Sequence, residues 1–182
     1  MAYQANMSYL VSMVLATVVV VGVAGASADI NLPEGWRFPT SAELEDDSLF
    51  REESPTGFAR SVADFDGDGQ EDSAFLLKST KFSGQGLLVK LAGTSDEDWL
   101  VLDEIRWGDE YPSVPLAMGM EVAPPGAYQT ACGKGYWDCQ PGEPEELNLS
   151  TPGLIYFRFA SASSMFHWDA ASESFQRTWL SD

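Results

Sequence analysis

Short runs of apolar and aromatic residues alternate with turns rich in Gly, Ser and Asp along most of the chain after residue 70. Aromatic and branched residues favour strands, and the intervening residues favour turns. The pattern predicts a mainly β fold, a small antiparallel β-sheet domain that is either a sandwich or partial-propeller-like. The predicted strands cover 73–78, 86–91, 99–102, 154–159, 164–168 and 175–179.

Helical and loop signals complete this prediction. A hydroxyl cap at Thr40 or Ser41 precedes Ala42-Glu43-Leu44, so we expect a short helix there and at most one or two short helices in the fold. Residues 169–174 are expected to join the last two strands as a hairpin. Residues 112–152, rich in Pro and Gly, are expected to form a long structured loop between the two groups of strands.

The N-terminal residues have a different character, because 10–25 are almost unbroken apolar sequence and are followed by Ala26-Ser27-Ala28. A small-x-small sequence after an apolar run is typical of a secretory signal peptide, although residues 1–9 contain no Lys or Arg. A retained membrane anchor is the alternative, but the run is shorter than the roughly 20 residues that a spanning helix needs. We interpret 1–28 as a signal peptide and 29–182 as a single calcium-binding β domain, periplasmic or secreted and free of the membrane after cleavage.

The formal net charge is −18, and residues 1–28 contribute none of it. Nucleic acid is not expected as a partner, because phosphate recognition needs a basic face and the chain has only 10 Lys and Arg against 28 Asp and Glu. A strongly acidic surface keeps a domain soluble and monomeric, and it attracts divalent cations or a basic protein.

Five acidic residues fall within the nine positions 64–72, three of them at alternate positions, Asp64, Asp66 and Asp68. Calcium binds six to eight hard oxygen ligands, and alternate acids in a tight turn supply them. The candidate ligands are Asp64, Asp66, Asp68 and Asp72, with the main-chain carbonyl of Gln70. Position twelve of a calcium hand would be a bidentate glutamate, but here it is Phe75, which argues against a calcium hand.

From Asp64 to Leu77 the sequence has the pattern Asp-x-Asp-x-Asp-Gly-x-x-Asp followed by a predicted strand. This segment resembles the calcium loop of FG-GAP and VCBS-type repeats, the integrin-alpha-like propeller units. The resemblance covers about residues 58–78, in a single copy. It implies Ca²⁺ as the cofactor. A propeller needs several four-stranded blades, which a chain of 182 residues does not supply.

The only two cysteines are Cys132 and Cys139. An even number of cysteines in an exported chain favours a disulfide, which here would close a short ring. A zinc site needs more Cys or His ligands than this region offers, and a redox pair is usually spaced Cys-x-x-Cys. Four residues in and near this ring either face a partner or fold back onto the sheet. They are Tyr128, Lys134, Tyr136 and Trp137.

Two classes of function remain open. The first is an exported, calcium-stabilised, non-catalytic β domain that binds a protein or a surface glycan. The alternative is a secreted or periplasmic hydrolase that uses acidic residues, with calcium in or near the site. No catalytic residue is nominated, because the only histidine, His167, lies in a predicted strand and no Gly-x-Ser-x-Gly elbow occurs. A cleft with two converging acids away from 64–72 would favour the hydrolase.

Overall fold

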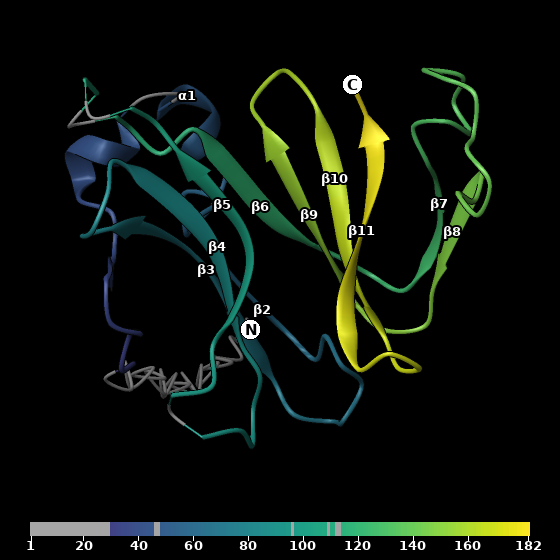
Figure 1. Ribbon diagram of the computed structural model, residues 1–182, viewed down its shortest axis with the longest axis horizontal. Helices are drawn as coiled ribbons and strands as arrows, with labels where there is room; N and C mark the ends of the chain where they lie inside the picture. The colour runs from purple at the N-terminus through teal and green to yellow at the C-terminus, as the bar shows by residue number, and fades with distance from the viewer. Residues whose placement is uncertain (1–29, 46–47, 96, 109, 112–113) are drawn as a thin grey trace, which may run out of the picture. The chain divides into compact units, whose positions relative to one another are not determined.

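The computed structural model describes residues 30–45, 48–95, 97–108, 110–111 and 114–182 (Figure 1). The expected signal peptide, 1–28, lies outside the described residues. Residues 31–182 belong to one compact unit. In the described ranges, the structure has no helix with the length and apolar character needed to cross a membrane.

The first sheet is antiparallel and is centred on β3, which has neighbours on both edges (Figure 1). On one edge β4 pairs along the strand and β5 pairs in turn with β4. On the other edge β2 pairs with the first half of β3, and the very short β1 pairs with its end. The strands are β1 (Trp36–Arg37), β2 (Arg60–Ala63), β3 (Asp72–Ser79), β4 (Gly84–Lys90) and β5 (Leu100–Arg106).

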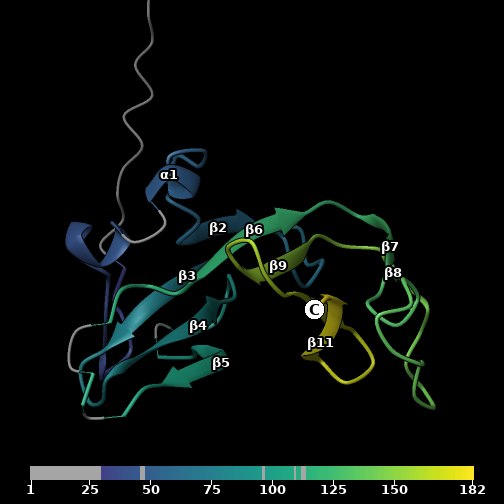
Figure 2. The ribbon, with the colours of Figure 1, turned by 90° about the horizontal axis from the view of Figure 1, so that it is seen from above.

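The second sheet has the order β11-β10-β9-β6 and is also antiparallel. Its first strand, β6, lies beside β2 of the first sheet, where the Met120 amide donates a hydrogen bond to the Phe58 carbonyl at 2.9 Å (Figure 2). Between β6 and β9 the chain forms a separate two-stranded ribbon, β7–β8. The bounds are β6 (Met118–Ala123), β7 (Gly126–Gln129), β8 (Glu146–Leu149), β9 (Gly153–Arg158), β10 (Ser163–Asp169) and β11 (Ser174–Ser181).

The main core is formed by side chains from both sheets. Leu76 and Leu87 of the first sheet belong to the same buried cluster as Leu154 and Tyr156 of the second. A smaller cluster on Met165 and its neighbours joins the second sheet to the β7–β8 ribbon. Burial of apolar area on both sides of the second sheet supplies the main driving force for this arrangement.

The mainly β, antiparallel prediction is confirmed, and each predicted strand overlaps an observed one. The expected short helix is the 3₁₀ turn η1 (Ser41–Leu44), where Thr40 caps the Glu43 amide and the Glu43 carboxylate accepts from the Thr40 amide. The single-turn α1 (Ser48–Arg51) is a second short helix.

The expectation of a long loop over 112–152 is wrong, because this stretch contains β6, β7 and β8. The strand β6 contains a glycine and a glutamate and has no run of β-branched residues. Its strand conformation comes from pairing with β9 over six residues rather than from local propensity.

Candidate functional site

The acidic loop 64–71 connects β2 to β3 and is shaped by its own carboxylates. Asp64 accepts hydrogen bonds from the amides of Gly67, at 2.7 Å, and Gly69, at 2.9 Å. Both glycines have positive φ angles, 82° and 88°, which L-residues with a Cβ rarely adopt. The chain therefore curls around the Asp64 carboxylate, as the calcium-loop interpretation requires.

Three of the predicted ligands meet at one point. Carboxylate oxygens of Asp64, Asp66 and Asp72 all lie within 4.8 Å of one another. Asp72 is the first residue of β3, and only 1% of it is exposed. Its two oxygens accept hydrogen bonds from the amides of Phe65 and Ala92, each at 2.8 Å, so its orientation is set by two separate segments of the chain.

The electrostatic environment of Asp72 is unfavourable for an isolated negative charge. Burial raises the pKa of the Asp72 carboxyl, and the nearby charge of Asp66 also raises it. The amides of Ala92 and Phe65 act in the opposite direction, because they stabilise the carboxylate. A bound cation would remove the repulsion between these acids.

Asp68 is not part of this group of three carboxylates. The Asp68 carboxylate accepts hydrogen bonds from the Gln70 amide, at 2.7 Å, and from its side-chain Nε2, at 2.9 Å. The three grouped acids supply hard oxygen ligands, the type that Ca²⁺ and Mg²⁺ prefer, and loop carbonyls or water could complete the coordination.

The loop is also packed against the second sheet. The ring of Phe65 is fully buried in the main core, 6.4 Å from the ring of Phe175 on β11. The Thr151 hydroxyl, in the turn between β8 and β9, donates to the Phe65 carbonyl at 3.1 Å. Order in the acidic loop is therefore coupled to the packing of one sheet on the other.

The disulfide prediction is confirmed. Cys132 and Cys139 are bonded, with their Cα atoms 4.9 Å apart, at the end of the β7–β8 ribbon. The same segment is attached to β11, because the Ala131 amide donates to the Trp179 carbonyl at 2.7 Å and Lys134 Nζ donates to the Leu180 carbonyl at 2.8 Å. The ring thus joins the ribbon to the last strand.

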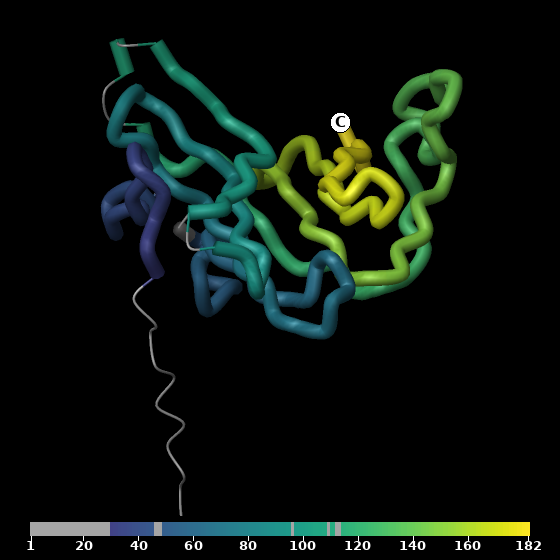
Figure 3. Tube along the Cα trace, turned by 60° about the horizontal axis from the view of Figure 1, so that its bottom comes forward, coloured from purple at the N-terminus to yellow at the C-terminus, as the bar shows by residue number. Residues whose placement is uncertain are grey.

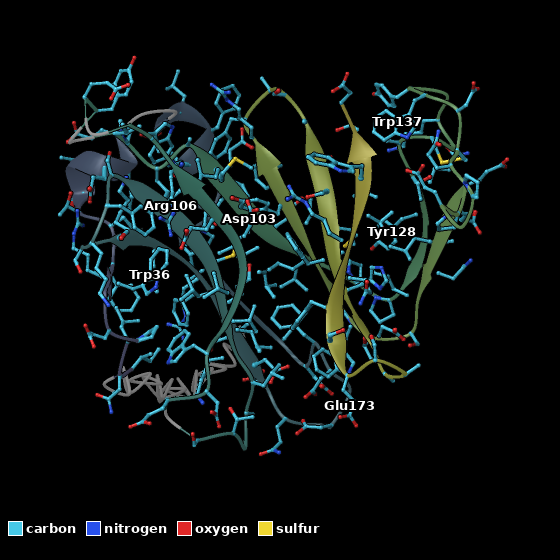
Figure 4. All side chains as sticks on the ribbon, viewed as in Figure 1. Trp36, Asp103, Arg106, Tyr128, Trp137 and Glu173 are labelled. Atoms are coloured by element: carbon cyan, nitrogen blue, oxygen red, sulfur yellow. A yellow bond between two sulfur atoms is a disulfide. The ribbon has the colours of Figure 1, made fainter. Side chains whose placement is uncertain are left out.

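The four candidate partner-binding residues have different surroundings, and two of them, Tyr128 and Trp137, are labelled in Figure 4. Tyr128 packs against the smaller core, and its hydroxyl donates to the Pro124 carbonyl at 2.7 Å. Trp137 is partly buried and donates to the Glu143 carboxylate, while the Lys134 ammonium is bonded to β11. Tyr136 is the most exposed of the three aromatic residues, at 53%. Tyr128 and the Lys134 ammonium therefore contact other parts of the fold, whereas Tyr136 is exposed.

His167 lies on β10, as expected for a strand residue, and its Nε2 is 3.4 Å from the hydroxyl of Thr178. Burial lowers the pKa of His167, so its neutral form is favoured. Together with Glu143 and Gln176 it lines a groove under the ribbon.

Comparison with protein-family models, curated proteins and solved structures finds no match. The functional argument therefore rests on the residues themselves. Sequence reasoning did not find that Trp168 and Glu173, on the β10–β11 hairpin, line a groove with the acidic loop. They lie about a hundred positions further along the chain, and no local pattern signals their position.

Proposed function

We propose that this protein is an exported, non-catalytic β domain that is stabilised by one calcium ion and that binds a protein partner. Asp64, Asp66 and Asp72 would hold the ion, with further oxygens from the Gln70 carbonyl, other loop carbonyls or water. The ion would fasten the β2–β3 connection and, through Phe65, support the core between the sheets.

The observation that carries this proposal is the position of Asp72. Asp72 is only 1% exposed and lies next to two other acids, and a carboxylate in such a position is destabilising unless it is paired or binds a cation. Two amide donors offset part of the desolvation and repulsion energy of this carboxylate, and a divalent cation between the three acids would offset the rest.

Export is supported by the disulfide, since disulfides persist mainly in oxidising compartments, and by the apolar N-terminal segment followed by Ala-Ser-Ala. These features serve stability outside the cytoplasm, and none of them activates a nucleophile. A binding role is therefore preferred to hydrolysis.

Thermal melting of residues 29–182 in EDTA, in Ca²⁺ and in Mg²⁺ tests the calcium site. Calcium at ten times its dissociation constant should add about 1.4 kcal/mol to the free energy of unfolding. Isothermal titration should give a stoichiometry of one. Equal melting temperatures in all three buffers, with no heat of binding, would refute the proposal.

A further inference from the structure

A groove of about 570 Å³ lies between the acidic loop and the β10–β11 hairpin. The two turns are distant in sequence but lie side by side (Figures 1 and 3). The described residues that line it are Asp66, Gly67, Asp68, Leu91, Leu100, Trp168, Ala170 and Glu173.

The groove has an apolar part made by Leu91, Leu100 and Trp168. The Trp168 ring is held from one side by Phe175, at 5.3 Å in an edge-to-face arrangement. Leu100 is 38% exposed at the start of the outer strand β5. An aromatic ring fixed in position next to exposed leucine area is suited to covering an aliphatic chain.

The polar part of the groove is entirely acidic among its described residues, because Asp66, Asp68 and Glu173 line it together with no Lys or Arg. Glu173 lies in the hairpin turn, labelled in Figure 4, and its φ of 49° is left-handed. Calcium held by Asp64, Asp66 and Asp72 would offset much of the loop's charge. The Asp68 carboxylate, which accepts hydrogen bonds from Gln70, and Glu173 would still present negative charge.

We propose that this groove binds a lysine or arginine side chain of a partner protein. The aliphatic stem would lie on Leu100 and Trp168, and the cationic head would reach Glu173 and Asp68. Long basic side chains combine an apolar stem with a charged head, and a cation over an indole ring gains further attraction. The net charge of −18 would draw a basic partner from a distance.

This inference specifies the partner in the function proposed above, and it is tested with a separate readout. The probes are N-acetyl-leucyl-arginine amide and its citrulline analogue, which has nearly the same shape and no charge. Each is titrated into the calcium-saturated domain while the Trp168 indole N–H is followed by NMR, with the signal assigned from Trp168→Phe. The arginine probe should shift this signal at low salt and bind at least about fivefold more tightly than the citrulline probe.

Glu173→Gln should weaken arginine binding roughly fourfold, the effect of one charge about 5 Å away in a water-like dielectric. Glu121→Gln, an exposed strand residue outside the groove, is the matched control and should not change it. Equal binding of both probes, an unmoved Trp168 signal, or a shift by cellobiose in place of arginine would each overturn the proposal. Melting in calcium reports separately on the metal site, so failure of one proposal is distinguishable from failure of the other.

Discussion

Replacement of Asp72 by asparagine separates the structural role of this carboxylate from its proposed role as a ligand. In the native protein its two oxygens accept from the amides of Phe65 and Ala92. Asparagine keeps one oxygen and turns an NH₂ group toward the other amide. One largely buried N–H donor then has no acceptor, which costs about 1–3 kcal/mol.

The net magnitude follows from two opposing effects. Asparagine carries no charge, so it relieves the burial and repulsion that raise the pKa of Asp72. We therefore expect a loss of about 2 kcal/mol in EDTA, equivalent to about 4–8 °C in melting temperature for a domain of this size. In calcium at ten times its dissociation constant, the wild-type protein gains about 1.4 kcal/mol that the variant does not.

The assay is thermal melting of wild type and Asp72→Asn in EDTA and in calcium, followed by amide hydrogen exchange. Exchange at Phe65 or Ala92 should become faster in the variant. Asp138→Asn, at an exposed position in the disulfide ring, is the matched control and should melt like wild type in both buffers. The reasoning is refuted if Asp72→Asn melts like wild type in EDTA, or if calcium raises its melting temperature as much as that of wild type.

Two further predictions concern the acidic loop and the 3₁₀ turn. Both Gly67→Ala and Gly69→Ala should cost about 1–2 kcal/mol for the left-handed backbone, but Gly67→Ala should cost more, because its new Cβ would lie 2.8 Å from the Thr151 methyl group. Urea denaturation of both variants measures the difference, and an equal loss would contradict it. Hydrogen bonds from Arg37 lower the pKa of Glu43 to about 2 from its ordinary 4.5, so the stability from this pair is complete above pH 4.5 and disappears as the pH falls toward 2. Because the Arg37 side chain is 42% exposed, Glu43→Gln should lower the free energy of unfolding by only about 1 kcal/mol at pH 7. Near pH 2 the substitution should have no effect. A loss of stability that is the same at both pH values would contradict this prediction.

The accuracy of the strand predictions depends on where each strand lies. β3 and β4 are buried almost throughout, and each contains a central apolar run, residues 74–77 and 87–89, that stands out from the turns around it. β6 and the β7–β8 ribbon have mixed sequences and exposed positions, and they become strands by pairing with distant partners. A local pattern does not contain that pairing.

The candidate site also has features that the local sequence pattern predicted and features that it did not. The spacing of Asp64, Asp66 and Asp72 predicted a shared centre, and the structure brings these three together. The same spacing included Asp68, whose carboxylate lies outside this group and accepts hydrogen bonds from Gln70. The residues in and near the disulfide ring were open between two interpretations, and the structure places them differently: Tyr128 packs against the smaller core and Lys134 is bonded to β11, whereas Tyr136 is exposed.

By itself, the sequence determined the features that depend on neighbouring residues: the acidic turn, the capped 3₁₀ turn, the disulfide ring and the buried strands. The interactions of the two turns and the ring close within about ten positions, and the buried strands contain apolar runs, so residue type and spacing are sufficient to find them. Only the tertiary structure decided that Asp72 is buried against the Ala92 amide and that Glu173 joins the acidic loop at one groove. Such contacts form when two sheets bury a common core. The hydrophobic effect that drives this burial is not directional, so a local sequence pattern does not specify which distant residues will come into contact.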